Sequence, residues 1–254
     1  MGRFASEKKD IYYRAAKEVG FRARSAFKLL ECNERFNLLH DGVNNVVDLC
    51  AAPGSWSQVL SQRLVLEKRE AGLTPSKVVA VDLQAMAPID GVTLIQGDIT
   101  SRVTAEGIVR HFEGGRSQLV VCDGAPDVTG LHDIDEWLQW QLLVSAVNIA
   151  THVLEVGGCF LAKMFTGPNT PLLEAALRTL FRTVAIHKPR SSRPGSHEAF
   201  VVAQGYDPPP TFTPSWKAPA LASGALLADK AGGGDTDSPC CPVTKFLSMG
   251  DLSA

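Results

Sequence analysis

Long apolar runs are absent from this sequence of 254 residues. A helix that spans a bilayer needs about 20 consecutive apolar residues, whereas the apolar runs here have the length of single strands. We therefore expect no membrane-spanning segment. The N-terminus, "MGRFASEKKDIYYRAAKE", is basic and lacks the apolar core of a secretory signal, so we expect a cytoplasmic protein.

Metal-binding patterns are also missing. The six cysteines are scattered, with no CxxC pair and no Cys/His cluster at zinc spacing. Three of them lie inside apolar runs, where Cys behaves as a small hydrophobic residue. The sequence therefore predicts reduced thiols and no metal site.

The net charge of −2 is small, but positive charge is concentrated in two places. Residues 1–28 hold eight Lys/Arg against three acids, and residues 178–193 hold five Lys/Arg and no acid. Phosphate backbones are bound by such clusters. On charge alone, however, solvated surface positions explain the two stretches at least as well.

Short apolar runs alternate with helix-like segments along most of the chain. Seven runs rich in Val, Ile, Phe and Cys predict strands buried on both faces, and helices are expected at 55–70, 101–112, 134–154 and 170–181. This alternation predicts an α/β fold, a mostly parallel sheet with helices on both faces. The connection "PRSSRPGSH" is too short for a crossover helix, so the last two strands should be antiparallel.

The chain divides into two parts by composition. Residues 1–206 are expected to form one domain that includes a basic N-terminal helical region, residues 1–36. Residues 207–254 carry seven of the fifteen prolines and the run "AGGGD". A segment of this kind has no core of its own, so we interpret it as a tail and as a candidate docking segment for a partner protein.

Four successive predicted strands end in a carboxylate: Asp48, Asp82, Asp98 and Asp123. The carboxyl ends of parallel strands meet at one edge of an open sheet, where such folds bind ligands. A single terminal Asp is usually a turn or capping residue. Four that converge would repel one another unless a ligand with hydroxyl, amine or positively charged groups lay among them.

Glycine is scarce in the turn after the first strand, "DLCAAPGSW", which contains only Gly54. A dinucleotide pyrophosphate needs the open backbone of a GxGxxG turn at a helix N-terminus, and the bulky Trp56 stands where it would lie. Asp82 lies 28 residues after Gly54, at the end of the second predicted strand. A carboxylate at that position commonly accepts hydrogen bonds from the hydroxyls of a ribose. A nucleoside without phosphates, such as S-adenosylmethionine, fits this pattern better than a nicotinamide dinucleotide.

The motifs "DLCAAPGSWSQVL", "VVAVDLQAMAP", "IQGDIT" and "VVCDGAPDVTGLHD" resemble those of the FtsJ-type S-adenosylmethionine-dependent RNA 2′-O-ribose methyltransferases. The segments "DIYYRAAKEVGFRARSAFKLLE", "KPRSSR" and "EAFVVAQGYDPP" are most similar to the eukaryotic cytoplasmic branch that acts on the tRNA anticodon loop. The resemblance spans roughly residues 1–210 and implies a Rossmann-like class I methyltransferase fold.

The resemblance also implies site residues. A catalytic tetrad would consist of Lys28, Asp123, Lys163 and Glu198, with Lys163 as the proton acceptor. The cofactor would be S-adenosylmethionine, bound by Gly54, Ser55, Trp56, Asp82, Asp98 and Asp123. RNA contacts are expected from Arg22, Arg24, Lys188, Arg190 and Arg193.

The same branch works with an auxiliary subunit, a WD-repeat or HEAT/armadillo-like protein, which selects the wobble nucleotide or the first loop nucleotide. Two alternatives remain open at this stage: a ribosomal-RNA 2′-O-methyltransferase of the same fold, and an inactive nucleoside- or RNA-binding scaffold. The second is disfavoured because all four tetrad positions carry the expected residue types.

Overall fold

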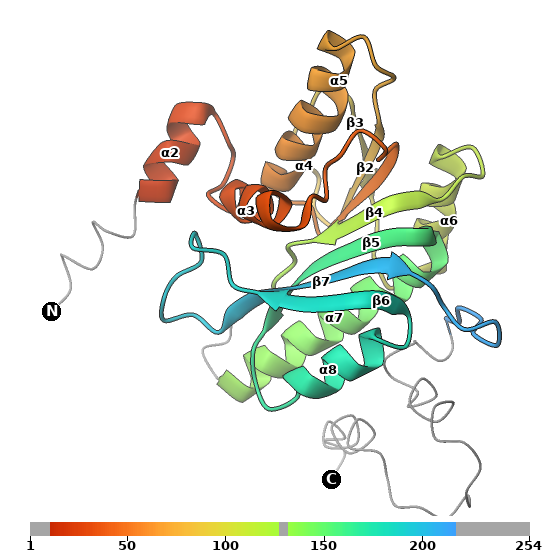
Figure 1. The fold of residues 1–254 in the computed structure, drawn as a ribbon. Coiled ribbons are helices and arrows are strands. Elements are labelled where there is room, and N and C mark those ends of the chain that lie inside the picture. Colours follow the sequence, from red (N-terminus) through yellow and green to blue (C-terminus); the bar gives the residue numbers. More distant parts are fainter. Residues whose placement is uncertain (1–10, 127–131, 217–254) are drawn as a thin grey trace, which may run out of the picture.

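A computed structural model of the chain describes residues 11–126 and 132–216 (Figure 1). The first ten residues of the predicted N-terminal region and most of the predicted tail, residues 217–254, lie outside the described residues. Among residues 11–126 and 132–216, no helix combines the length and apolar content that crossing a membrane requires.

Seven strands form one sheet in the order β3-β2-β1-β4-β5-β7-β6. Strands β1 to β5 are parallel, and β7 is antiparallel to both β5 and β6. This confirms the predicted mostly parallel sheet with an antiparallel last pair. The strands are β1 (Asn45–Leu49), β2 (Lys77–Asp82), β3 (Val92–Gln96), β4 (Ser117–Cys122), β5 (Leu154–Phe165), β6 (Phe181–His187) and β7 (Glu198–Tyr206).

Helices cover both faces of the sheet (Figure 1). One face packs against α3 (Ala26–Phe36) and against a continuous helical rod made of α4 (Ser55–Leu60), the π-helical η1 (Ser61–Leu66) and α5 (Glu67–Glu70). The other face packs against α6 (Arg102–His111), α7 (His132–Val153) and α8 (Thr170–Leu177). The N-terminal α2 (Ile11–Val19) projects from the first layer, with the side chains of Ile11 and Val19 exposed.

Side chains of the central strands alternate between these two layers. Val47 and Leu49 of β1 pack towards α6–α8, whereas Val46 packs towards α3 and α4. In β5, Phe160 and Ala162 likewise face α7 and α8, whereas Leu161 faces α3 and α4. Both faces are therefore buried, which explains the continuous rather than alternating apolar runs.

Two element boundaries differ from the prediction. The helix expected to run to residue 181 ends at Leu177. The N–H of Leu180 donates to the carbonyl of Leu177 in a turn, and Phe181 then pairs with Tyr206 in the sheet. Strand β5 begins at Leu154, before the expected residue 159, with an irregularity opposite Ser117 and Leu119. Both are tertiary effects that local composition does not encode.

The described start of the tail lies against the domain. Phe212 and Trp216 pack on the core, and the Trp216 ring stacks on His152 with centroids 4.1 Å apart and 9° between the planes. Residues 207–216 thus bury their aromatic side chains on the domain instead of forming a core of their own. The division at residue 206 remains a prediction, although it coincides with the end of β7.

Candidate active site

A cavity of about 1050 Å³ lies at the carboxyl ends of β1 to β4. The strand order reverses between β1 and β4, and ligands of open α/β sheets bind at such a point. Three of the predicted carboxylates, Asp82, Asp98 and Asp123, line this cavity. Apolar groups complete it, among them Cys50, Ala52, Pro53, Leu83, Met86, Ile99 and Leu142.

The turn that closes one side of the cavity is held by β2. The N–H of Ala51 donates to the carbonyl of Val81 at 3.1 Å, and the N–H of Ala52 donates to Asp82 Oδ2 at 2.8 Å. Gly54 has φ of +105°, a conformation that side chains disfavour. A Cβ at Gly54 would lie 2.7 Å from Nη1 of Arg22, so this glycine is needed for protein packing as well as for backbone conformation.

Gly54, Ser55 and Trp56 do not line the cavity, and their predicted contacts with the cofactor remain predictions. Trp56 is buried under α3, where its Nε1 donates to the carbonyl of Ser25 at 2.8 Å and its ring lies 5.7 Å from that of Phe200. Ser55 Oγ is hydrogen-bonded to Ser25 Oγ at 2.7 Å. The helical spacing of Trp56, Val59, Leu60 and Leu64 is the sequence signal that indicated a core position.

The four residues of the predicted tetrad form two lysine–carboxylate pairs. Lys28 Nζ lies 2.7 Å from Glu198 Oε2, and Lys163 Nζ lies 3.3 Å from Asp123 Oδ1. Lys163 Nζ also donates to the main-chain oxygen of Asp123 at 2.8 Å. All four side chains are largely buried, at 9–16% exposure, so each charge depends on its partner.

Phe200 connects the two pairs. It is the cross-strand partner of Lys163 in the β5–β7 ladder, and opposed residues share a face of the sheet. The Lys28 ammonium lies 5.7 Å from the centre of the Phe200 ring. Asp123 belongs both to this group and to the cavity wall. The structure therefore brings the four predicted residues to one place beside the cavity.

The tetrad is positioned by two further residues, which the sequence analysis did not identify. On α7, the buried Gln139 donates through Nε2 to the carbonyls of Lys163 at 3.1 Å and Gly124 at 3.3 Å. Ser192 Oγ donates to Glu198 Oε1 at 2.7 Å. Burial alone would raise the pKa of Glu198, but the Lys28 ammonium and the hydrogen bonds from Lys28 and Ser192 lower it below its ordinary value.

Comparison with known proteins identifies the family. The family model described as FtsJ-like methyltransferase matches residues 21–206. The chain belongs to the FtsJ-like methyltransferases. A tRNA (cytidine(32)/guanosine(34)-2′-O)-methyltransferase of Mus musculus is 56% identical, over all of this chain and 75% of the relative. A protein of that name from Schizosaccharomyces pombe is 54% identical, over 99% of this chain and 85% of the relative.

More distant similarities agree with this membership. A ribosomal RNA large subunit methyltransferase E of Methanothrix thermoacetophila is 38% identical, over 79% of this chain and 74% of its own. A crystal structure from Plasmodium falciparum, titled as a ribosomal RNA methyltransferase, superposes with a TM-score of 0.64 at 24% identity, over 73% of this chain and 98% of its own. That likeness and the strand order confirm the predicted Rossmann-like methyltransferase fold.

The cavity of this methyltransferase fits S-adenosylmethionine, the cofactor of the family. Its acidic rim suits a ribose, an adenine amine and a sulfonium cation, whereas three carboxylates would repel a pyrophosphate. Asp123 also belongs to the cavity wall, although its Oδ1 is buried and lies 3.3 Å from the Lys163 ammonium. Asp82, Asp98 and Asp123 are the side chains that would hold the cofactor.

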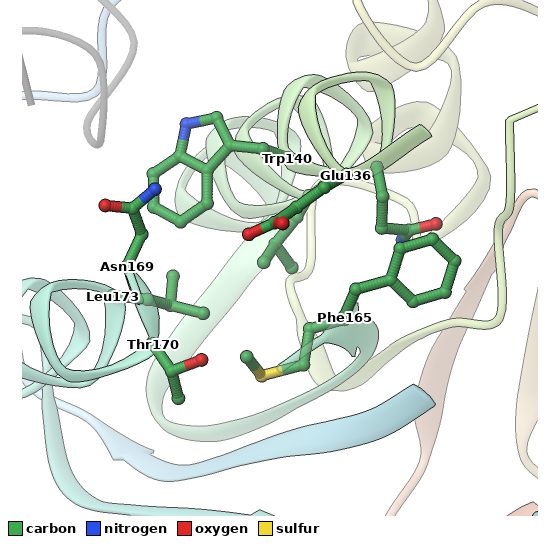
Figure 2. Close-up of a pocket in the computed structure, with 9 residues that line it drawn as sticks. Glu136, Trp140, Phe165, Asn169, Thr170 and Leu173 are labelled. Carbon is green, nitrogen blue, oxygen red and sulfur yellow. The ribbon is translucent and has the colours of Figure 1, made fainter. Parts of the chain in front are cut away.

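A second cavity, between α7, the end of β5 and α8, is much smaller (Figure 2). It is lined by Glu136 and Trp140 of α7, by Phe165 at the end of β5 and by Asn169, the residue before α8. Its volume of about 20 Å³ corresponds to about one water molecule. A nucleoside therefore does not fit this smaller cavity. Among residues 11–126 and 132–216, no group of His, Cys, Asp or Glu has a metal-binding arrangement.

Asp48 is the fourth predicted carboxylate, and it lies beneath the cavity, not on its wall. It is 1% exposed, its Oδ2 accepts a hydrogen bond from Ser57 Oγ at 2.6 Å, and its Oδ1 has no hydrogen-bond partner among the described residues. Burial raises its pKa from 3.8 to about 7, with further increases from the charges of Asp123 and Asp82, although the Ser57 hydrogen bonds oppose the rise.

This raised pKa predicts a pH-dependent stability. Because the folded protein binds the Asp48 proton more tightly than the unfolded chain, the associated stability is complete below about pH 4 and is lost as pH rises to about 7. Asp48→Asn, which has no such proton, should gain at least about 1 kcal/mol relative to wild type between pH 5 and pH 8. Urea unfolding at both pH values measures this, and parallel pH curves for the two proteins would contradict it.

The predicted RNA-contacting residues divide into two groups. Lys188, Arg190 and Arg193 are exposed on the loop between β6 and β7. Glu31 fixes that loop by accepting hydrogen bonds from the main-chain N–H groups of Arg190 and Ser191, at 2.6 and 3.0 Å. Arg24 donates to the carbonyl of Ser191. Arg22, by contrast, is bonded to the cofactor turn and lines the cavity.

Proposed function

We propose that this protein methylates the 2′-oxygen of ribose in the tRNA anticodon loop, at cytidine 32, guanosine 34 or both. The observation that carries the proposal is the convergence of two lysine–carboxylate pairs beside a cavity suited to S-adenosylmethionine, in which Asp123 belongs both to the Lys163 pair and to the cavity wall. The positions follow from the names of relatives that are 54–56% identical over nearly the whole chain.

The proposed chemistry needs a group that takes the hydroxyl proton, since a ribose hydroxyl is a weak nucleophile. S-adenosylmethionine supplies the methyl group when it is bound. Lys163 is the proposed proton acceptor, because it is held at the end of β5 by Asp123 and Gln139 at the cavity edge. Lys28 and Glu198 would position the ribose and stabilise the charge that develops as the proton leaves.

RNA is the proposed substrate because its 2′-hydroxyl is the nucleophile, and DNA lacks it. Loop nucleotides can be splayed out from a stem for such chemistry. The exposed Lys188, Arg190 and Arg193 extend from the strand pair that carries Glu198, and Arg24 adjoins them. Ribosomal RNA is the second candidate, supported by the ribosomal relative at 38% identity.

The test is transfer of labelled methyl groups from S-adenosylmethionine to an anticodon stem-loop. We expect incorporation into the unmodified stem-loop and its loss when 2′-deoxynucleotides replace both position 32 and position 34. A 2′-deoxynucleotide at position 32 alone or at position 34 alone identifies which ribose is methylated. Labelling that persists with both deoxynucleotides would contradict the assignment, and labelling of ribosomal RNA alone would favour the second candidate.

We propose further that an auxiliary protein, of the WD-repeat or HEAT/armadillo-like kind, selects the nucleotide, and that the complex acts in the cytoplasm. The resemblance of the sequence to the anticodon-loop branch supports both. The side chains of Ile11 and Val19, exposed at 64% and 61%, also support a partner because they are large apolar groups on a projecting helix.

A further inference from the structure

The guanidinium of Arg22 bridges two separate segments at the cavity. Its Nη1 donates to the carbonyl of Pro53, in the turn after β1, at 2.9 Å. Its Nη2 donates to the carbonyl of Pro88, in the loop after β2, at 3.0 Å. Pro53, Arg22 and the preceding part of that loop, Leu83 to Ala87, all line the cavity. One side chain thus ties together two segments of the cavity wall.

The surroundings of Arg22 are built for this bridge. Gly54 leaves room for the guanidinium, since a Cβ there would lie 2.7 Å from Nη1 and 2.9 Å from Ile89 Cδ1. The main-chain N–H of Arg22 donates to Gln58 Oε1 at 2.7 Å. Hydrogen bonds therefore hold both the main chain and the guanidinium of Arg22. The position of the side chain is determined by the cofactor turn and the loop after β2.

The segment that contains Arg22 is joined to the same turn at two further points. Gln58 Nε2 donates to the carbonyl of Gly20 at 3.1 Å, and Trp56 Nε1 donates to the carbonyl of Ser25. Three residues after Ser25 comes Lys28 of the tetrad. The N-terminal segment that leads to Lys28 is therefore linked to the cofactor turn by several hydrogen bonds.

We propose that Arg22 is a positioning residue of the cofactor site, which holds the turn at Pro53 and the loop at Pro88 in their binding geometry and couples cofactor binding to RNA binding. Both of its terminal nitrogens already donate to main-chain carbonyls at the cavity, so its role differs from that of a phosphate contact such as we expect from the exposed Arg190. The RNA half of the proposal rests on the proposed function, but the cofactor half does not.

The experiment titrates S-adenosylhomocysteine, the demethylated product of the cofactor, into the full chain by calorimetry. Arg22→Gln removes the charge, and Arg22→Lys keeps it but cannot reach both carbonyls at once. Both should bind the probe about ten-fold more weakly, with KM for S-adenosylmethionine raised and kcat changed less than three-fold. Arg14→Gln, an exposed charge loss on α2, is the control and should bind the probe as wild type does.

The RNA arm repeats the titration with the anticodon stem-loop present. In wild type the stem-loop should tighten probe binding, and by linkage the probe should tighten stem-loop binding by the same factor. Arg22→Lys should lose this mutual effect, whereas Arg24→Gln should weaken stem-loop binding alone. Melting temperatures establish that each variant is folded.

Two results overturn the proposal. Wild-type probe affinity in a folded Arg22→Lys protein would exclude the positioning role, and weakened stem-loop binding with unchanged probe affinity would make Arg22 a simple RNA contact. If the stem-loop does not bind wild type at all, the proposed substrate fails, while the probe titration without RNA still decides the cofactor role of Arg22.

Discussion

Replacing Lys163 with methionine is expected to lower kcat for methyl transfer about 10³-fold, which is within the range that general-base groups contribute. Methionine keeps the length of the side chain and removes the amine that contacts Asp123 at 2.8 and 3.3 Å. The measurement is single-turnover transfer of labelled methyl groups to the anticodon stem-loop, with S-adenosylhomocysteine affinity as the test that the cavity is intact.

Lys163→Arg separates proton transfer from orientation. Arginine donates hydrogen bonds and keeps the positive charge, but it is not deprotonated in proteins. If Lys163 accepts the proton, the arginine variant should be about as inactive as the methionine variant. Activity within ten-fold of wild type in Lys163→Arg would show instead that this residue orients the ribose and that the proton leaves by another route.

Glu198→Gln and Lys28→Met should each lower kcat about 10²-fold, and the double variant should be little worse than either single one. The reason is that the two side chains form one unit: Lys28 Nζ lies 2.7 Å from Glu198 Oε2, and Ser192 holds the other carboxylate oxygen. Residues that act as a unit are strongly non-additive.

The double-mutant cycle is measured with the same transfer assay and accompanied by urea unfolding of all four proteins. Glutamine retains a hydrogen-bond acceptor for Ser192, so Glu198→Gln changes the charge with little change in shape. A double variant whose loss equals the product of the two single losses would show that the residues act independently, and would remove the pair from the proposed mechanism.

The sequence predicted much of the fold because the signals were local and consistent. Seven apolar runs became seven strands of one sheet, and the helical segment 55–70 is continuous. The early start of β5 and the early end of α8 could not be anticipated, because both depend on pairing with residues distant in sequence: Ser117 for β5 and Tyr206 for the turn into β6.

The sequence predicted some residues of the site and not others. The carboxylates at the ends of β2, β3 and β4 reach the cavity because parallel strands end at one edge. Trp56 was predicted as a cofactor contact from its place beside the glycine turn, whereas its burial against Phe200 is a tertiary feature that the local sequence does not encode. Gln139 and Ser192 have no sequence signal of this kind: their roles arise from tertiary hydrogen bonds to Lys163, Gly124 and Glu198.

The position of β7 between β5 and β6 has a consequence for how the protein is made. Lys28 and Glu198 are 170 residues apart in the chain, and Glu198 is the first residue of β7. Contacts of such separation form late, since the chain between them must be ordered first. During synthesis, the partner of Lys28 is missing until the ribosome has released the strand that closes the sheet. A nascent chain that does not yet include β7 therefore lacks the carboxylate that pairs with Lys28.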